Sequence, residues 1–274
     1  MNKKTYKTSP LPFMGQKRRF VKDFNEALDG YSPKAVYIDL FGGSGLLSHT
    51  VKAKYPEAKV IFNDYDNFRQ RINAIPETNI LLVNLRKLLQ DWPSKKRVDG
   101  KMKDHIISTI SEHEKKFGYV DFITLSGSLL FSGKHALDID EMKKCGIYNR
   151  VRVSDFDATG YLEGLEVVSQ DYKVLFDQYA KEDDVVFLID PPYLQTSSKT
   201  YKNYWKLRDY LDVLTVMNGQ RYFYFTSNKS SIIELCEWIG DQTVTSNLFA
   251  NATRKEVSGN VNYASSYTDI MLFK

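Results

Sequence analysis

Residues 184–193 spell Asp-Val-Val-Phe-Leu-Ile-Asp-Pro-Pro-Tyr, an apolar run that stops at an acid followed by two prolines. A continuous apolar run of this length is typical of a central strand in a parallel sheet, because such a strand is buried on both faces. The prolines end the strand, since they lack an N–H donor and have a fixed φ angle. The sequence therefore predicts a parallel sheet with Asp190 and Tyr193 just beyond the carboxyl end of a central strand.

The end of this strand carries hydrogen-bond acceptors and an aromatic ring. The carbonyl groups of Asp190 and Pro191 are each followed by a proline, so they need donors from elsewhere. An exocyclic amino group can donate to them and to the Asp190 carboxylate, and the planar base that bears it can stack on Tyr193. A proline turn without a ligand is the alternative interpretation. The acid before the prolines and a glycine loop upstream favour a binding site.

That glycine loop lies at residues 35–45, where Ala-Val-Tyr-Ile-Asp-Leu-Phe leads into Gly-Gly-Ser-Gly. Glycines let the backbone approach a ligand closely. The loop lacks the third glycine of the dinucleotide pattern G-x-G-x-x-G, and its acid, Asp39, would repel a phosphate. An acid there suits a cationic amino-acid group, such as the methionine end of S-adenosylmethionine. A further strand, residues 59–62, ends in Asn63-Asp64, and an acid in this place commonly binds a ribose diol.

Strand-like and helix-like segments alternate on both sides of a long middle region, as in a parallel sheet covered by helices on both faces. The predicted strands are 35–40, 58–62, 165–169, 184–189, 221–226 and 268–273, with a weaker one at 244–249. The predicted helices are 17–29, 44–54, 66–74, 171–181, 203–217 and 229–239. We therefore expect one α/β domain made of residues 1–77 and 161–274, with residues 78–160 inserted into it.

The inserted region is strongly charged. Between Arg86 and Lys116 it has nine Lys or Arg residues and five acids. A pair of solvated charged helices is the simpler interpretation. The alternative is a surface for a polyanion, because clustered Lys and Arg supply most of the sequence-independent affinity for phosphates. Downstream, residues 131–134 and 148–152 carry Asn, Arg and Tyr groups that suit base edges and backbone.

Composition sets broad limits on the function. Of the 274 residues, 42% are hydrophobic, which is enough for a large core, and no apolar run approaches the length of a membrane span. Residues 1–5 have no apolar signal core, so we expect a cytoplasmic protein. Cys145 and Cys236 are isolated, so we expect neither a metal site nor a disulfide framework. Neither cysteine follows a proline, which argues against a cytosine-C5 methyltransferase. The net charge of +4 mildly favours a polyanionic partner.

A segment near the start, residues 10–17, spells Pro-Leu-Pro-Phe-Met-Gly-Gln-Lys. With this segment the order of motifs resembles that of the Dam-type (D12 class) DNA adenine-N6 methyltransferases. In that family an aromatic-x-Gly-x-Lys segment comes first, followed by the glycine loop, a target-recognition insert and Asp-Pro-Pro-Tyr. The resemblance covers roughly residues 9–70 and 165–274. It implies a Rossmann-like S-adenosylmethionine-dependent methyltransferase sheet with helices on both faces and an inserted, mainly helical target-recognition region.

The resemblance also implies three groups of site residues. Catalysis falls to the tetrapeptide Asp190, Pro191, Pro192 and Tyr193. Binding of S-adenosyl-L-methionine falls to Phe13, Lys17, Asp39, Phe41, Gly42, Gly43, Asp64, Asp171, Tyr172 and Asp190. Contacts with double-stranded DNA would come from the insert, through Lys95, Lys96, Arg97, Lys134, Asn149, Arg150 and Arg152. The insert lacks the Arg-Tyr-Asn hairpin of GATC-specific relatives, so no recognition sequence is implied.

On this resemblance, the chain methylates the exocyclic N6 amine of a flipped adenine in DNA, in a bacterium or a phage-infected cell. Whether a cognate restriction endonuclease is its partner is left open. One alternative is an RNA or protein-amide N-methyltransferase, which more often has Asn first in the tetrapeptide. Another is a non-catalytic DNA-binding relative, which would have a damaged tetrapeptide or glycine loop. The missing third glycine disfavours a nicotinamide-dependent oxidoreductase.

Overall fold

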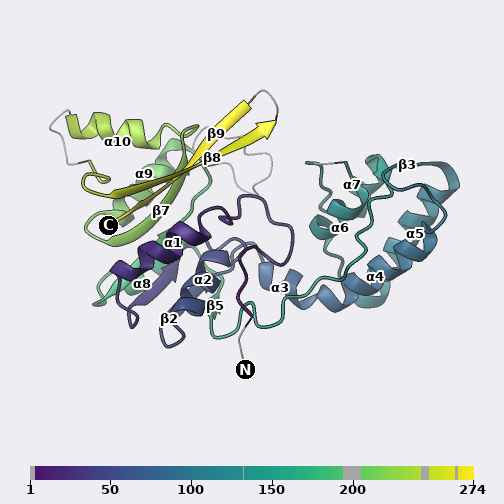
Figure 1. Cartoon of the computed structure of the whole chain (residues 1–274), viewed down its shortest axis with the longest axis horizontal. Coiled ribbons are helices and arrows are strands. Elements are labelled where there is room, and N and C mark those ends of the chain that lie inside the picture. Colours follow the sequence, from purple (N-terminus) through teal and green to yellow (C-terminus); the bar gives the residue numbers. More distant parts are fainter. Residues whose placement is uncertain (1–3, 132, 194–204, 242–246, 263–264) are drawn as a thin grey trace. The chain divides into compact units, whose positions relative to one another are not determined.

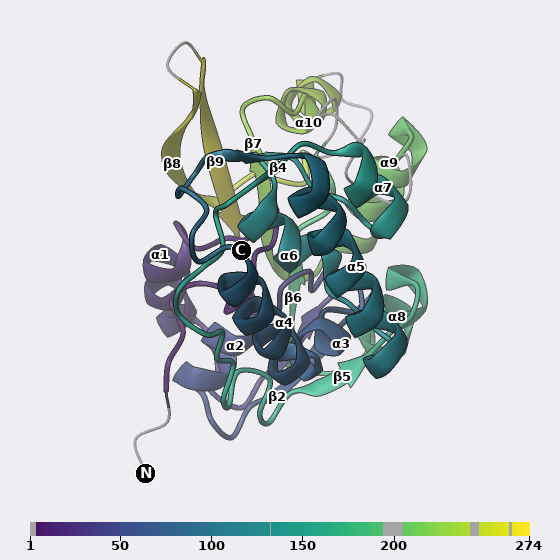
Figure 2. The same cartoon turned by 90° about the vertical axis from the view of Figure 1, so that its right-hand side faces the viewer.

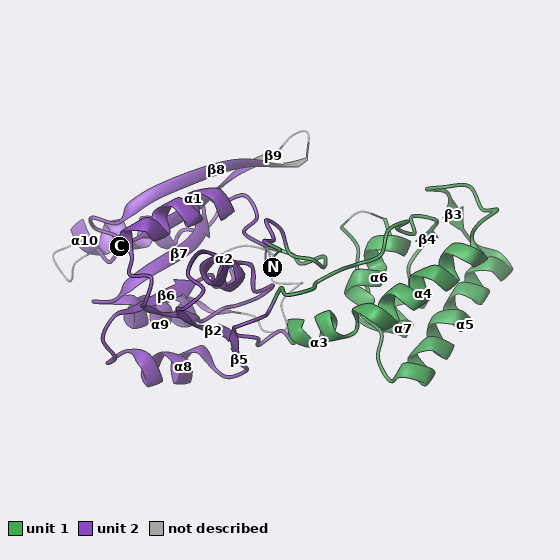
Figure 3. Cartoon of the chain, turned by 60° about the horizontal axis from the view of Figure 1, so that its bottom comes forward, with its two compact units in different colours: residues 1–4, 9–14, 67–161 green, residues 5–8, 15–66, 162–274 purple. Residues whose placement is uncertain are grey.

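The computed structural model of the chain describes residues 4–131, 133–193, 205–241, 247–262 and 265–274. The chain divides into two compact units (Figure 3). The sheet unit comprises residues 5–8, 15–66 and 162–274, and the helical unit comprises residues 1–4, 9–14 and 67–161. Within the described ranges, no helix combines the length and apolar character that a membrane span requires.

The sheet unit is built on a seven-stranded sheet with the strand order β5-β2-β1-β6-β7-β9-β8 (Figure 1). The first five strands of this order are mutually parallel, whereas β9 runs antiparallel to both β7 and β8. In the same order, the strands span Glu166–Val168, Lys59–Asn63, Val36–Asp39, Val185–Ile189, Arg221–Ser227, Ser265–Phe273 and Thr253–Asn262. The apolar run before the two prolines is thus β6, in the middle of the sheet, as predicted.

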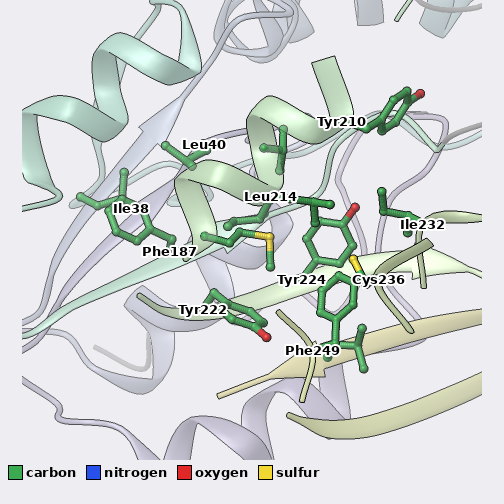
Figure 4. Packing of buried hydrophobic residues seen from close by; sticks show 14 of the residues in the cluster. Ile38, Leu40, Phe187, Tyr210, Leu214, Tyr222, Tyr224, Ile232, Cys236 and Phe249 are labelled. Carbon is green, nitrogen blue, oxygen red and sulfur yellow. The ribbon is translucent and has the colours of Figure 1, made fainter. Parts of the chain in front are cut away.

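Helices pack on both faces of this sheet. Val186 and Leu188 of β6 belong to the core that also contains Phe24 of α1 and Val51 of α2. Alternate β6 residues belong to the opposite core, where Phe187 packs with residues of α8, α9 and α10 (Figure 4). This two-sided burial explains why β6 is apolar without interruption. The helices are α1 Val21–Ala27, α2 Leu46–Lys54, α8 Tyr172–Tyr179, α9 Leu207–Met217 and α10 Ile232–Asp241, and a short 3-10 helix, Leu28–Gly30, follows α1.

The helical unit consists mainly of helices with one small sheet. Its helices are α3 Phe68–Asn73, α4 Ile75–Leu88, α5 Gly100–Phe117, α6 Phe122–Leu129 and α7 Ile139–Lys144. Helices α4 and α5 lie side by side (Figure 2). The strands β3, Arg97–Val98, and β4, Ile147–Tyr148, pair antiparallel. The expectation of a mainly helical insert in an α/β fold is therefore confirmed.

The helical unit begins earlier in the chain than the residue 78 that we expected. Arg71 explains the difference, because its guanidinium lies buried within this unit. It forms an ion pair with Asp121 at 3.0 Å and donates to the carbonyl oxygen of Pro12 at 2.7 Å and to Thr124 Oγ1 at 3.1 Å. These bonds join α3 and residues 9–14 to the helical unit.

The antiparallel edge of the sheet differs from expectation as well. Strand β8 was not predicted, because its start, Thr-Arg-Lys-Glu, is charged and exposed rather than apolar. Half of the weaker strand prediction at 244–249, residues 244–246, lies outside the described residues. Its last two residues belong to a turn, 248–251, rather than to a strand.

Candidate active site

Three acids meet at the carboxyl edge of the parallel strands. Asp39 ends β1, Asp64 follows β2, and Asp190 follows β6. Strand β1 pairs with both of the others, so that Asp39 is opposite Phe62 on one side and Leu188 on the other. Ligands of open α/β sheets bind at this edge. The glycine loop and the tetrapeptide therefore follow two neighbouring strands, β1 and β6.

Asp39 is buried and only half satisfied. Its Oδ2 accepts a hydrogen bond of 2.6 Å from Ser48 Oγ, whereas Oδ1 has no hydrogen-bond partner among the described residues. Burial raises the pKa of Asp39 to about 7, although the Ser48 hydrogen bond opposes this shift. A buried acceptor without a donor is unfavourable, so the Oδ1 atom suits the donor group of a ligand.

The glycine loop after β1 packs tightly on β2. A Cβ atom on Gly42 would lie 2.3 Å from the Phe62 ring and 2.7 Å from the Asn63 carbonyl oxygen. Gly43 and Gly45 have φ angles of 51° and 71°, in the left-handed region that glycine adopts readily. The loop therefore needs its glycines for its own geometry, and the predicted cofactor contacts of Gly42 and Gly43 remain predictions.

The end of β2 contributes a structural amide and a buried acid. Asn63 Nδ2 donates to the carbonyl oxygens of Leu40 at 3.0 Å and Gln170 at 2.9 Å, and Asn63 Oδ1 accepts from Gln170 N at 3.0 Å. Asn63 thus connects the ends of β1, β2 and β5. Asp64 is 5% exposed. Sequence reasoning missed the role of Asn63, although a polar residue at the end of a buried strand was a usable signal.

Lys17 lies against the tetrapeptide. Its Nζ forms an ion pair of 2.5 Å with Asp190 Oδ2, donates to the Gly15 carbonyl oxygen at 2.7 Å, and lies 5.3 Å from the centre of the Tyr193 ring. Burial raises the pKa of Asp190 above its ordinary value, and the Lys17 ammonium opposes that shift. Pro191 is buried, and Pro192 and Tyr193 are half-buried. The structure thus brings Lys17, predicted as a cofactor contact, to the predicted catalytic acid.

Asp269 of β9 is a further acid near Lys17, and sequence reasoning missed it. Its Cα partner is Ser227 of β7, two residues beyond Phe225, so Asp269, Ser227 and Phe225 share one face of the sheet. Lys17 Nζ lies over that face, 6.0 Å from the Phe225 ring centre. Burial raises the pKa of Asp269, and attraction to Lys17 opposes the shift. Its distance from the tetrapeptide along the chain hid this acid from motif reasoning.

Aromatic rings gather beside the glycine loop. Phe41 lies 4.9 Å from Tyr172 and 5.6 Å from Trp205 between ring centres, and Tyr172 stacks on Trp205 at 6.0 Å. Trp205 was not predicted. Asp171 caps α8 instead, since its Oδ1 accepts from Lys173 N at 2.8 Å. Phe13, the last of the predicted cofactor contacts, belongs to the helical unit and packs edge-on against Phe68.

In the helical unit, β3 and β4 join the two segments predicted to bind DNA. Lys95 N donates to the Asn149 carbonyl oxygen at 2.6 Å, Asn149 N donates to Lys96 O at 2.9 Å, and Arg97 is opposite Tyr148. The side chains of Lys95, Lys96 and Arg97 are exposed. The basic cluster and the polar run, far apart in sequence, therefore form one continuous segment of surface.

The other predicted DNA contacts differ in how they are held. Asn149 Nδ2 donates to the Trp92 carbonyl oxygen at 2.6 Å and to the Leu89 carbonyl oxygen at 3.4 Å, so its amide hydrogens are engaged within the helical unit. Arg150 Nη1 donates to Leu130 O at 3.1 Å, and the Arg152 guanidinium lies 4.2 Å from the Phe156 ring centre. Lys134 is exposed. The described part of the chain has no group of three or more His, Cys, Asp or Glu residues that could hold a metal ion.

Comparisons with known proteins indicate the family of the chain. No family model matches the chain. A Haemophilus influenzae protein named "Putative methyltransferase" is 36% identical over 282 residues, covering 100% of this chain and 94% of the relative. Among solved structures, a precorrin-6y C5,15-methyltransferase from Geobacter metallireducens has a TM-score of 0.37 at 8% identity, covering 96% of this chain and 94% of its own. An rRNA methylase from Streptococcus thermophilus has a TM-score of 0.35 at 10% identity, covering 96% and 99%.

Proposed function

The chain belongs to the methyltransferase family of its Haemophilus influenzae relative, and on that premise we propose that it methylates the exocyclic N6 amine of adenine in DNA, with S-adenosylmethionine as methyl donor. The observation that carries the proposal is the position of Asp190 directly beyond β6, with Tyr193 three residues on and Asp39 at the end of the neighbouring strand. An acid, a proline carbonyl and a ring in sequence suit a planar base that bears an amino group.

The sheet unit offers groups that fit S-adenosylmethionine. Asp39 Oδ1, which has no hydrogen-bond partner among the described residues, is buried, and a cationic amino group placed there would favour the ionised carboxylate. Asp64 is the acid that suits a ribose diol. Phe41 and Tyr172 present rings beside the glycine loop, where an adenine can pack. When bound, the cofactor supplies a methyl group that its sulfonium makes electrophilic.

The tetrapeptide would position the target amine. An adenine N6 atom is a poor nucleophile because its lone pair is delocalised into the ring. Hydrogen bonds from this amine to the Asp190 carboxylate and the Pro191 carbonyl favour the pyramidal geometry that frees the lone pair. Tyr193 can replace the stacking that the base loses when it leaves the duplex. Held in this way, the amine needs little further activation, since positioning contributes much of the rate.

Lys17 supports this role of Asp190. The Asp190 carboxyl group accepts a hydrogen bond more strongly when it is ionised, and burial works against ionisation. The Lys17 ammonium binds Oδ2 and stabilises the charged form, which leaves Oδ1 to accept from the amine. A direct contact of Lys17 with the cofactor, as the resemblance implies, remains part of the proposal.

Transfer of radiolabelled methyl groups to separate substrates tests the proposal. The purified full chain is incubated with labelled S-adenosylmethionine and duplex DNA, RNA or a total protein extract. We expect label in DNA alone, and an initial rate of labelling lower by on the order of 10²–10³ with the Asp190→Ala variant. Label confined to RNA or to protein would contradict the substrate assignment, and binding of NAD without binding of S-adenosylmethionine would contradict the cofactor.

A further inference from the structure

Arg19, two residues after Lys17, packs on the antiparallel edge of the sheet. Its Nη1 donates to Tyr267 Oη at 3.3 Å and lies 3.5 Å from the Ser258 carbonyl oxygen. The guanidinium carbon lies 5.7 Å from the centre of the Tyr267 ring. Arg19 is nevertheless exposed. The head group of Arg19 is therefore exposed and contacts both β8 and β9.

Gly259 of β8 provides the space for this arrangement. A Cβ atom at this position would lie 1.8 Å from Arg19 Nη1 and 2.9 Å from the Tyr267 ring. The φ angle of Gly259 is not in the left-handed region, so its backbone does not require glycine. A glycine inside a strand weakens the strand and often marks the close approach of another group. Here the approaching group is the Arg19 guanidinium.

The surroundings of Arg19 contain a second cation, Lys229, and a half-buried acid, Asp269, whose pKa is raised by burial although attraction to Lys17 and Arg19 lowers it. Lys229 Nζ lies 5.9 Å from the centre of the same Tyr267 ring. Tyr267 precedes Asp269 by two residues in β9, so both lie on the face of the sheet that Lys17 covers. No carboxylate of the described residues forms an ion pair with Arg19. Two cations thus lie near one ring, at 5.7 Å and 5.9 Å from its centre.

We propose that Arg19, held by Gly259 and Tyr267, binds a backbone phosphate of the DNA strand that delivers the target base, an inference that rests on the proposed function. Nη1 is engaged with Tyr267, whereas Nε and Nη2 have no hydrogen-bond partner in the described part of the chain. These two groups form the edge of a guanidinium that binds two phosphate oxygens at once.

Binding of a labelled duplex by the full chain, measured over a series of salt concentrations, tests this inference. Loss of one phosphate contact should reduce the slope of log affinity against log salt by about 0.9, and we expect this for Arg19→Ala. Arg19→Lys should preserve the slope, because it keeps the charge, and should weaken binding, because it loses the second hydrogen bond. Gly259→Ala should weaken binding in the same direction, since its Cβ displaces the guanidinium.

Lys22→Ala is the matched control. This variant removes the same charge from the next turn of chain, but the Lys22 side chain is 85% exposed and forms only a 3.9 Å ion pair with Glu26. We expect the wild-type slope for this variant and an unchanged KM for S-adenosylmethionine in all four. If Arg19→Ala had the slope of Lys22→Ala while the wild type methylated DNA, this inference alone would be overturned. If the wild type neither bound nor methylated any duplex, the proposed function would be overturned together with it.

Discussion

Each unit of the molecule has a buried acid, and the two acids are satisfied to different degrees. In the helical unit, Asp121 accepts from Arg71 Nε at 3.0 Å, from Thr124 N at 3.0 Å and from Thr124 Oγ1 at 2.5 Å. In the sheet unit, Asp39 accepts from Ser48 Oγ and has one oxygen without a partner among the described residues. Removing a buried carboxylate that has all its partners leaves a buried charge unpaired, whereas a carboxylate with an unfilled acceptor indicates a place for a ligand.

The lysines of the two units also differ, in this case in burial. Lys17 of the sheet unit is buried and paired with Asp190, so its charge serves the site. Lys95 and Lys96 of the helical unit are exposed, so their charges are available to a large polyanion. These charged groups should therefore give different phenotypes when they are mutated. Loss of Asp121 should lower stability, loss of Asp190 should lower the rate of methyl transfer, and loss of Asp39 should weaken cofactor binding. Loss of the exposed basic side chains should reduce the salt dependence of DNA binding.

The largest effect should come from Asp121→Ala. It leaves the Arg71 guanidinium buried without its counterion, which typically costs about 3–5 kcal/mol in the free energy of unfolding. Denaturant unfolding of the full chain measures this change. Asp39→Asn is the control, because it removes an equally buried acid that has no ion pair, and it should lower stability much less. Equal losses in the two variants would remove the distinction between the two acids.

Asp190→Ala should reduce methyl transfer by on the order of 10²–10³, since it removes one of two acceptors for the target amine. The drop should appear in kcat, measured under saturating DNA and cofactor, while circular dichroism shows a folded protein. A variant that turned over within a factor of about three of the wild type would show that Asp190 is not catalytic.

Asp39→Asn should weaken binding of S-adenosylmethionine by roughly 1.5–3 kcal/mol, the range for a charge-assisted hydrogen bond. Because the pKa of Asp39 is raised to about 7, its ionised form is abundant only above that pH. Wild-type affinity should therefore fall as the pH drops through about 7, whereas the variant, whose amide does not titrate, should give a flat profile. Calorimetric titration at several pH values measures both, and a flat wild-type profile would contradict this role of Asp39.

Replacing Lys95, Lys96 and Arg97 together by Ala should weaken binding to every DNA sequence about equally. The slope of log affinity against log salt should fall by up to roughly 2–3 units if all three contact phosphates. Salt titrations on matched and scrambled duplexes test this expectation. An unchanged slope would mean that the exposed cluster is a solvated surface without a partner.

The smallest effect should come from Asp269→Asn. Burial is the main cause of the raised pKa of Asp190, and the Asp269 carboxylate raises it further, so neutralising Asp269 should lower the pKa of Asp190. The acid limb of the pH profile of kcat/KM should then move to lower pH, with little change in the rate at neutral pH. A shift to higher pH would show that Asp269 acts on Asp190 in another way, for example by positioning Lys17.

The sequence allowed prediction of features that depend on neighbouring residues. The prolines and unbroken apolar run identified β6 and its end, and the glycine loop identified the end of β1. Contacts between residues far apart in the sequence could not be predicted, because no local pattern links Lys17 to Asp190 or brings Asp269 to the site. The two-residue strands β3 and β4 are too short to show a period, and Arg71 moved the unit boundary through buried bonds with distant partners.

Mass spectrometry of nucleosides from duplex DNA treated with the full chain and S-adenosylmethionine tests the central claim most directly. We expect N6-methyladenine in DNA treated with the wild type, and in the same short incubation on the order of 10²–10³ less in DNA treated with Asp190→Ala. N4-methylcytosine in place of N6-methyladenine, or equal N6-methyladenine from the wild type and the variant, would contradict the claim that Asp190 positions an adenine amine for methylation.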